Sequence, residues 1–473
     1  MNVSFLQELL NTVAEQSRAL LPKALFGTGE HNLEDLARAL MSGRGEASGV
    51  AIARQLLNRL KVASRDERRA FYTFLADELQ PNANAVAEAA SAYLEGPSEQ
   101  SLSDLQRVTE SPRREFFRRL NLAHGATAEI VAMRREILGL GKDAHVFAAL
   151  DGDLQYLLQT WFNRGFLVLR RIDWQTPAAI LEKIIAYEAV HEIKGWDDLR
   201  RRLDPRDRRC FGFFHPALVD EPLIFVEVAL MREIPGAIAP VLEAGQDTGD
   251  GDPTTAVFYS ISNCQDGLKG ISFGNFLLKQ VVEELARDVP SLKTFVTLSP
   301  VPNFARWLDR ALADTGSDMV TVEDRARLTV LSDPRWLGVA KQAGQQSDQL
   351  RASLSALAAH YFLAAKSRDR PVDPVARFHL GNGARLERIN WLADTSQKGL
   401  RDAYGLMVNY RYEPADIEKN HEAYAQFGTI AASRQVRGLL RAPLKPKAGP
   451  AAPEILPPLA RPNHKKLPSG AGP

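Results

Sequence analysis

The fold is decided between residues 256 and 300, which read AVFYSISNCQDGLKGISFGNFLLKQVVEELARDVPSLKTFVTLSP. Two runs rich in β-branched and aromatic residues, 256–262 and 294–299, have the composition of buried strands. Between them lie a glycine-bearing loop, 266–275, and a segment, 276–287, whose apolar residues recur at the three- and four-residue steps typical of a helix. The order is strand, glycine loop, helix and strand.

The glycine loop is a candidate phosphate-binding segment. Gly267, Gly270 and Gly274 allow a close approach, and a loop leading into a helix presents backbone N–H groups at the positive end of the helix dipole. Its spacing fits neither the P-loop, which needs Gly-Lys-Ser or Gly-Lys-Thr, nor the dinucleotide fingerprint Gly-x-Gly-x-x-Gly. Because such turns more often serve backbone geometry than ligands, the loop alone leaves both interpretations open.

More strands and one more helix extend this pattern. Runs at 210–214 and 223–230 indicate strands upstream, and a helix is expected from Val301 to Leu312, because Pro300 suits an early helical position. The set resembles the core of the GNAT acyltransferases, whose loop holds the pyrophosphate of coenzyme A. The loop departs from the usual GNAT pattern, so this likeness supports the ligand class only modestly.

The first part of the chain has helical periodicity at 5–21, 50–62, 69–79 and 105–122. Ser64-Arg-Asp-Glu67 and Ser101-Leu-Ser-Asp104 have the form of a capping box and are expected to begin helices. The cluster Arg113–Arg119 is expected to be a solvated helical face paired with Glu and Asp, rather than an anion site. We expect residues 1–193 to form a helical domain that serves packing and oligomerisation.

Composition excludes several classes of protein. Lys plus Arg (59) nearly cancels Asp plus Glu (58) in 473 residues, so no bulk charge favours nucleic acid or a membrane. Two cysteines, Cys210 and Cys264, are too few for a disulfide framework or a zinc site, which favours a reducing cytoplasm. Glu8 and Glu15 interrupt the apolar N-terminus, which indicates an amphipathic helix rather than a signal peptide.

The last segment, 434–473, is expected to be a Pro-rich disordered tail. It has nine prolines from Arg441 onward and few residues that could form a core. A partner-binding role and a dispensable extension are equally compatible with this composition.

Candidate chemistry gathers around His379, in Phe378-His-Leu-Gly-Asn-Gly383. A histidine titrates near neutrality, and one in a loop-like stretch among glycines and amides is a candidate for proton transfer. Its expected partner is Ser299. Taken alone, Ser299 before a proline could equally be a strand end or a helix cap, and most histidines are structural.

The chain is similar to the malonyl-CoA decarboxylase family over about residues 190–430. The likeness lies in Phe258-Tyr-Ser-Ile-Ser262, Gly267–Lys279, Leu298–Phe304, Phe378–Ala384, Arg388-Ile-Asn-Trp391 and Gly405-Leu-Met-Val-Asn-Tyr-Arg-Tyr412. This resemblance implies an α+β protein, with the helical domain followed by a GNAT-like catalytic domain with a mixed β-sheet at 194–433. It implies conversion of malonyl-CoA to acetyl-CoA and carbon dioxide without a metal or organic cofactor.

The resemblance also implies roles for particular residues. Ser299 and His379 would be the catalytic pair; to this pair the residue types add Tyr412, as a group that orients the carboxylate or the pair itself. The substrate-binding residues would be this pair together with Lys269, Gly270, Ile271, Ser272, Phe273, Gly274 and Asn275. The family further suggests a homo-oligomer, a tetramer or dimer, assembled through the helical domain. A GNAT-like acyltransferase or acyl-CoA-binding protein is the alternative.

The residue types suit the implied chemistry. Loss of carbon dioxide from malonyl-CoA leaves an enolate, which must be stabilised and then protonated on the α-carbon. We expect His379 to donate this proton, while Ser299 binds the carboxylate or the oxyanion, or accepts a proton in a relay. Further candidates are the amide donors Asn382, Asn390 and Asn409, and the substrate-orienting residues Tyr410 and Arg411.

Overall fold

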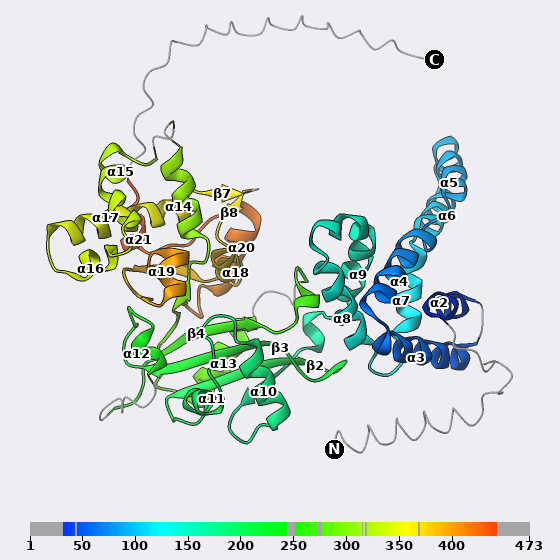
Figure 1. Ribbon diagram of the computed structural model, residues 1–473, viewed down its shortest axis with the longest axis horizontal. Helices are drawn as coiled ribbons and strands as arrows, with labels where there is room; N and C mark the ends of the chain where they lie inside the picture. The colour runs from blue at the N-terminus through cyan, green and yellow to red at the C-terminus, as the bar shows by residue number, and fades with distance from the viewer. Residues whose placement is uncertain are drawn as a thin grey trace, which may run out of the picture.

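The computed structural model describes residues 32–42, 45–243, 251–271, 277–314, 316, 319–367 and 369–441. A helical region, a mixed β-sheet with flanking helices, and a C-terminal group of helices follow one another along the chain (Figure 1). The expected α+β class is confirmed. Within the described ranges, no helix is long and apolar enough to cross a membrane.

The helical region consists of α2 Leu33–Met41, α3 Glu46–Val62, α4 Arg65–Glu78, α5 Ala83–Glu95, α6 Glu99–Thr109, α7 Pro112–Leu120, α8 Ala126–Leu138 and α9 Ala148–Trp161. The capping box of Ser64 and Glu67 is confirmed at the start of α4. The second expected start was wrong, because Ser98 caps α6 and Ser101 occupies its third position, where its hydroxyl replaces the usual Glu side chain. The helix expected at 5–21 lies outside the described residues.

The arginine cluster of α7 is only partly a solvated face. Arg118 and Arg119 pair with Glu115 near the surface, as expected. Arg113, however, is buried and donates to Asp153 at 2.7 Å, and Arg114 donates to the other oxygen of the same carboxylate. The expectation was wrong at Arg113, because α9 brings a buried carboxylate against this end of α7.

We expect Asp153→Ala to lower the free energy of unfolding by about 3–5 kcal/mol, because a buried guanidinium would lose its carboxylate. Glu115→Ala, at an exposed pair, should cost less than about 1 kcal/mol. Urea unfolding followed by circular dichroism measures both changes. Equal losses in the two variants would contradict an anchoring role for Asp153.

The sheet has the order β1-β2-β3-β4-β5-β10-β6, with β9 on the other edge of β10. Its strands are β1 Val168–Ile172, β2 Arg208–His215, β3 Leu218–Met231, β4 Thr255–Asn263, β5 Thr294–Thr297, β6 Ser299–Pro300, β9 Arg385–Asn390 and β10 Met407–Tyr412. Only β4 and β5 pair in parallel, and α13 Leu277–Asp288 connects them. The two strands and the helix predicted from residues 256–300 are therefore confirmed, in a mixed sheet. Residues 272–276, between the described part of the loop and α13, lie outside the described residues.

The strands β9 and β10 were not expected from the sequence, and neither was β1. β1 lies within the range assigned to the helical domain, yet it pairs antiparallel with β2, from Val168 opposite Phe214 to Ile172 opposite Cys210. Its side chains are mostly exposed, so it lacks the apolar run of a buried strand. The sheet thus begins before residue 193.

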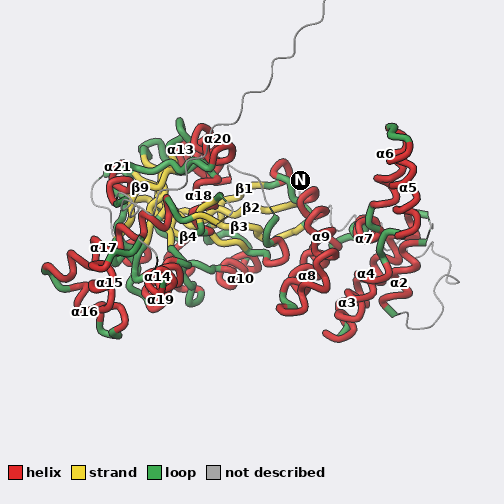
Figure 2. The backbone as a smooth tube through the Cα atoms, turned by 90° about the horizontal axis from the view of Figure 1, so that it is seen from above, coloured by secondary structure: helices red, strands yellow, loops and turns green. Residues whose placement is uncertain are grey.

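Helices cover both faces of the sheet. α10 Ala178–Tyr187 and α11 Trp196–Leu203 pack Ile184 and Leu199 against Cys210 and Phe225. On the opposite face, α13 packs with Val226 and Phe258 of the sheet. Figure 2 shows α13 and α10 on opposite sides of the strands.

The short helix α12 Ala239–Leu242 lies between β3 and β4 and packs Val241 with Ala229 and Val257 of the sheet. The C-terminal group consists of α14 Phe304–Ala313, α15 Val322–Leu328, α16 Trp336–Lys341, α17 Gln345–Leu363, the pair β7 Lys366–Ser367 and β8 Arg370–Pro371, α18 Pro374–Gly381, α19 Gln397–Ala403, α20 Ile417–Phe427 and α21 Arg434–Leu439. The helix predicted from Val301 is α14, but it begins at Phe304, because Pro300 lies in β6 opposite Met407 and not in the first turn of the helix. The first residues of the expected tail are folded, since α21 buries Val436 and Arg441 pairs with Asp324. Residues 442–473 lie outside the described part of the chain.

Candidate active site

A break in the sheet positions Ser299. β5 ends at Thr297 and β6 begins at Ser299, and β10 pairs with both, with Tyr412 opposite Phe295 and Val408 opposite Ser299. At the break, the Tyr410 N–H donates to Thr297 Oγ1 at 3.1 Å, and Asn409 Nδ2 donates to the Thr297 carbonyl at 2.8 Å. These bonds replace the interrupted ladder and hold the turn that leads to Ser299.

His379 lies on α18 and not in the loop-like stretch that we expected. Asp373 caps this helix, its carboxylate accepting from the Ala376 N–H at 2.8 Å, and Pro374 opens the first turn. Gly383, at φ +83°, follows the end of the helix, and a Cβ there would lie 2.1 Å from the Ile417 carbonyl oxygen. The glycines after His379 therefore terminate a helix rather than form a flexible loop.

Asp373 is itself buried against a neighbouring helix. The hydroxyl of Tyr361, on α17, donates to its carboxylate at 3.0 Å. Burial raises the pKa of Asp373 to about 6. The start of the helix that carries His379 is thus held by a buried cap.

Ser299, His379 and Tyr412 form one buried group, which we call the Ser-His-Tyr cluster. Ser299 Oγ lies 3.1 Å from His379 Nε2, and the Tyr412 hydroxyl lies 2.8 Å from His379 Nδ1. The three residues are 5%, 2% and 1% exposed. The structure therefore brings together the three residues that the sequence proposed as catalytic.

Aromatic rings enclose the imidazole. The ring of Tyr410 stacks on His379 with centroids 4.5 Å apart and planes 24° apart, and Phe378 meets it edge-on at 5.1 Å. This burial lowers the pKa of His379 to about 3. In the ligand-free protein the imidazole is therefore neutral near pH 7.

The hydrogen bonds around Ser299 orient the neutral ring. The Ser299 hydroxyl donates to Thr297 Oγ1 at 2.8 Å, so its oxygen is available to accept from His379 Nε2–H. Nδ1 is then the acceptor for the Tyr412 hydroxyl. The cluster thus has a single direction of donation, from Tyr412 through His379 to Ser299 and Thr297.

Thr297 and Asp373 were missed in the sequence. Thr297 lies two residues before Ser299, so the alternation of a strand places both side chains on one face. Asp373 directly precedes Pro374, which is a helix-start signature. Both patterns can be recognised in the sequence. Neither indicates, without the tertiary structure, that Thr297 or Asp373 lies near His379 or supports it.

Several other expected residues have partners elsewhere. Asn390 Nδ2 donates to Asn409 Oδ1 at 2.8 Å, and Asn382 Nδ2 donates to the Phe378 carbonyl at 2.8 Å. Arg411 pairs with Glu413. Arg411 alternates with Tyr410 and Tyr412 and so lies away from the cluster, while Asn409 acts on it only through the turn at Thr297.

The proposed coenzyme A loop is described only in part. Gly270 has the left-handed φ of +81°, Lys269 is exposed and Ile271 is buried. Ser272, Phe273, Gly274 and Asn275 lie outside the described residues. Because β4 and β5 are parallel neighbours, the loop after β4 and Ser299 after β5 lie at the same edge of the sheet.

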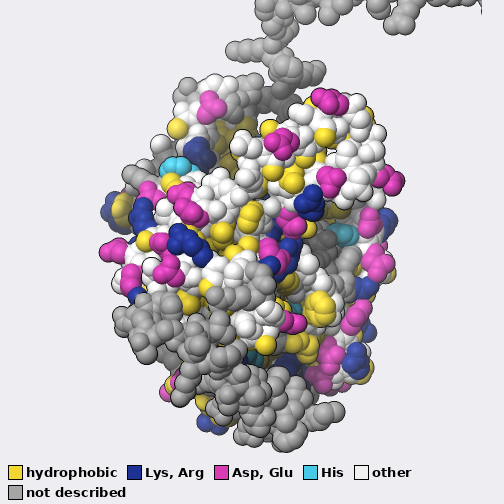
Figure 3. Space-filling model, turned by 90° about the vertical axis from the view of Figure 1, so that its right-hand side faces the viewer, with side chains coloured by type: hydrophobic (Ala, Val, Ile, Leu, Met, Phe, Trp, Pro, Cys, Tyr) yellow, Lys and Arg dark blue, Asp and Glu magenta, His cyan; other side chains and the backbone are white. Residues whose placement is uncertain are grey.

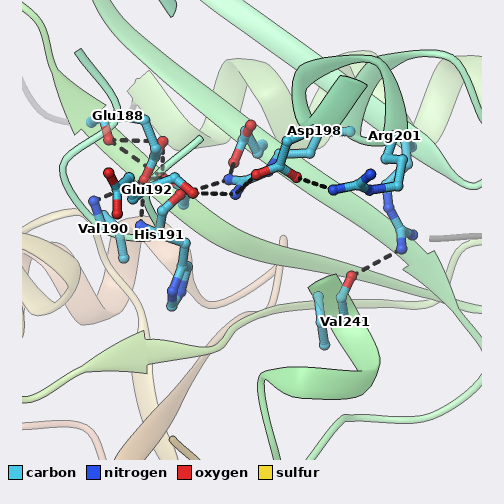
Figure 4. A network of polar contacts seen from close by, with 12 residues as sticks. Glu188, Val190, His191, Glu192, Asp198, Arg201 and Val241 are labelled. Atoms are coloured by element: carbon cyan, nitrogen blue, oxygen red, sulfur yellow. Dashed lines mark hydrogen bonds and ion pairs between the residues drawn. The ribbon is translucent and has the colours of Figure 1, made fainter. Parts of the chain in front are cut away.

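A second polar network lies on the α10–α11 side of the sheet (Figure 4). Glu188 accepts hydrogen bonds from the Ser260 and Ser262 hydroxyls and from the N–H groups of Val190 and His191. These bonds tie the α10–α11 connection to β4.

The same network contains a fully buried carboxyl group, that of Glu227, whose pKa burial raises to about 8. Arg202 Nη1 lies 3.2 Å from it and also donates to the His191 carbonyl at 2.8 Å. Burial lowers the pKa of His191 to about 4. Arg202 thus ties Glu227 to the backbone, while Glu227 Oε1 and His191 Nε2 are buried without a hydrogen-bond partner among the described residues.

Neither cysteine nor metal chemistry is indicated by the described residues. Cys210 and Cys264 are free and buried, and burial raises the pKa of both thiols, so neither is an activated nucleophile. In the ranges that the structure describes, no group of three or more His, Cys, Asp or Glu side chains is arranged to hold a metal ion.

The buried imidazole predicts a pH dependence of stability. The pKa of His379 is about 3 in the folded protein, and the ordinary histidine value of 6.5 applies to the unfolded chain. Between these two pH values the unfolded chain therefore binds a proton at His379 that the folded protein does not bind. The free energy of unfolding should therefore fall with falling pH, by up to about 1.4 kcal/mol per pH unit from this group. His379→Gln should remove this part of the slope.

Urea unfolding of the unaltered protein and of His379→Gln, between about pH 6 and about pH 4, measures how the free energy of unfolding depends on pH. Above about pH 7 the two curves should run parallel, which provides the internal control. Equal slopes in the acidic range would contradict a neutral, buried His379.

Two family models match the chain. The model described as the malonyl-CoA decarboxylase N-terminal domain matches residues 79–162, and the one described as the malonyl-CoA decarboxylase C-terminal domain matches residues 165–449. Together they span the helical region from α5 onward, the sheet and the C-terminal helices.

Curated relatives have the same description. The mitochondrial malonyl-CoA decarboxylase of the goose Anser anser anser is 38% identical over 356 residues, which cover 70% of this chain and 70% of the goose protein. The mitochondrial enzyme of Mus musculus is 35% identical over 364 residues, covering 71% of this chain and 73% of the mouse protein.

Solved structures agree with this likeness. A malonyl-CoA decarboxylase from Rhodopseudomonas palustris has a TM-score of 0.81 and 51% identity, covering 86% of this chain and 98% of that one. The corresponding protein from Agrobacterium vitis has a TM-score of 0.79 and 53% identity, covering 87% and 100%.

Proposed function

Since the chain belongs to the malonyl-CoA decarboxylase family, we propose that its Ser-His-Tyr cluster is where it acts as a carboxy-lyase, converting malonyl-CoA to acetyl-CoA and carbon dioxide. The observation that supports this site most directly is the buried contact of 3.1 Å between Ser299 Oγ and His379 Nε2. It joins, across eighty residues, two groups suited to binding an anion and moving a proton.

The reaction requires one proton for each turnover. Cleavage of the bond between the α-carbon and the carboxylate releases carbon dioxide and leaves the electron pair in the thioester enolate. A proton delivered to the α-carbon then gives acetyl-CoA, and water restores that proton to the protein. The site must therefore favour an enolate and place a proton donor beside it.

His379 is the proposed proton donor. It is neutral in the ligand-free protein, but a substrate carboxylate placed beside it favours the charged imidazolium. Tyr412 suits both states, because its hydroxyl can donate to a bare Nδ1 and its oxygen can accept from Nδ1–H. The proton on Nε2 then faces Ser299 and the substrate.

Ser299 is the proposed contact to the substrate. Its hydroxyl is held by Thr297 and His379, and can turn from Thr297 to donate to the malonyl carboxylate or the enolate oxygen. A donor already fixed by its neighbours costs little reorganisation when charge develops.

The loop that begins at Lys269 is proposed to hold the coenzyme A part of the substrate. It lies at the same sheet edge as Ser299, and Gly270 provides the left-handed backbone that a close approach requires. This proposal extends to Ser272, Phe273, Gly274 and Asn275 on the family resemblance alone.

We expect Ser299→Ala and His379→Ala to lower kcat for malonyl-CoA by roughly a hundred- to ten-thousand-fold, since each removes a group that acts in the reaction. Tyr412→Phe should lower kcat by about tenfold, the effect of one hydrogen bond to the imidazole. Acetyl-CoA formation, followed with malonyl-CoA as the sole substrate, measures turnover.

Tyr404→Phe is a matched control, because it removes a tyrosine hydroxyl that bonds to Asp309. Its turnover should stay close to that of the unaltered protein. Near-normal activity in folded Ser299→Ala or His379→Ala would contradict the proposed site. Formation of acetyl-CoA without any acceptor separates decarboxylation from acyl transfer.

The α5–α6 hairpin is the proposed surface for self-association. Neither helix contains a buried residue, and both project away from the sheet (Figure 1). Leu94 at the end of α5 is 78% exposed. Figure 3, which views this end of the molecule, shows apolar side chains interspersed with charges of both signs. A second copy could cover this hairpin in a dimer or tetramer.

Leu94→Glu tests this surface, because a charge there would be buried in the assembly. Size-exclusion chromatography with light scattering should show an oligomer for the unaltered protein and a smaller species for the variant. Val322→Glu, at a residue 80% exposed on α15, should keep the original mass. A monomeric unaltered protein, or an unchanged mass for Leu94→Glu, would contradict the proposal.

We also propose that the protein is cytoplasmic. The free thiols of Cys210 and Cys264 are compatible with a reducing compartment. The goose and mouse relatives are described as mitochondrial.

A further inference from the structure

A buried arginine of the helical region reaches the loop that follows β4. Arg134, on α8, is 2% exposed. Its Nη1 donates to the carbonyl oxygens of Gly267 at 2.7 Å and Lys269 at 2.9 Å, and its Nε donates to Asp151 at 2.7 Å. One guanidinium therefore connects the helical region to two peptide groups of the proposed substrate loop.

The loop backbone lies directly against α8. A Cβ added at Gly267 would lie 2.0 Å from the Val131 carbonyl oxygen, so only glycine fits this position. From α9, Gln155 Nε2 lies 3.4 Å from the Gly270 carbonyl oxygen. The carbonyls at Gly267, Lys269 and Gly270 thus all face the helical region.

This arrangement fixes the direction of one backbone donor. In a trans peptide the C=O and the following N–H point in opposite directions, so holding the Lys269 carbonyl on α8 turns the Gly270 N–H away from it. The N–H groups of Leu268, Lys269 and Ile271 donate within the turn. The Gly270 N–H has no acceptor among the described residues.

An ion pair fixes the guanidinium beneath the turn. Its Nη1 donates to the Gly267 and Lys269 carbonyls from this side of the turn. Asp151, 26% exposed, is its ionic partner on the side of the helical region. The loop is therefore held by an anchored guanidinium on the side opposite to the Gly270 N–H.

We propose that Arg134 is a positioning residue for substrate binding, which orients the peptide between Lys269 and Gly270 so that its N–H donates to a phosphate oxygen of coenzyme A. This inference rests on the proposed function and deepens it. It makes the helical region a part of the substrate site, in addition to any role in assembly.

The test compares ligands with and without the nucleotide. Arg134→Met keeps the apolar stem but loses every donor, and should weaken coenzyme A binding, measured by calorimetry, roughly tenfold. The KM for malonyl-CoA should rise by about the same factor with kcat within about twofold, because only ground-state binding is lost. For malonyl-pantetheine, which lacks the nucleotide, kcat/KM should stay within about twofold.

Two further variants make the result specific. Arg134→Lys keeps the charge and should recover part of the affinity. Arg135→Ala removes an exposed arginine one position along α8 and should leave both ligands unaffected. A folded Arg134→Met with unchanged coenzyme A affinity, or one that loses both substrates equally, would overturn the proposal. Failure of the decarboxylase proposal would appear separately, as absence of turnover in the unaltered protein, while coenzyme A binding would still test Arg134.

Discussion

Ser299 and His379 meet because a single strand, β10, spans the break between β5 and β6. It pairs with both pieces, and at the gap its backbone and the Asn409 side chain bond to Thr297. The same strand carries Tyr410 and Tyr412 on the face toward α18. The geometry of the whole cluster thus depends on the pairing of β10 across this interruption.

Burial determines the chemical state of the cluster. The rings of Phe378, Tyr410 and Tyr412 exclude water from His379, and desolvation keeps the free imidazole neutral. An anionic substrate beside His379 would favour the protonated imidazolium instead. The proton is then present when the reaction needs it. A group with an ordinary pKa on the surface would offer no such coupling between binding and protonation.

The helical region contributes more than packing. The buried pair of Arg113 and Asp153 holds α7 to α9, and α8 then presents Arg134 to the loop after β4. A polar contact between two buried segments demands that both keep their positions, because an unpaired guanidinium in the interior is costly. The substrate loop is in this way supported from both the sheet and the helices.

Local patterns in the sequence were sufficient for the elements around residues 256–300 and, with the family resemblance, for Ser299, His379 and Tyr412. They misplaced the start of α6, assigned His379 to a loop, and overlooked β1, Thr297 and Arg134, because exposed strands and single polar residues carry little periodic signal. Only the tertiary structure decided that Ser299 and His379, eighty positions apart, are in contact, and that the imidazole of His379 is buried from water. It alone also showed that α8 holds the loop after β4. Contacts of this range depend on how strands pair and helices pack, and no local periodicity encodes that pairing.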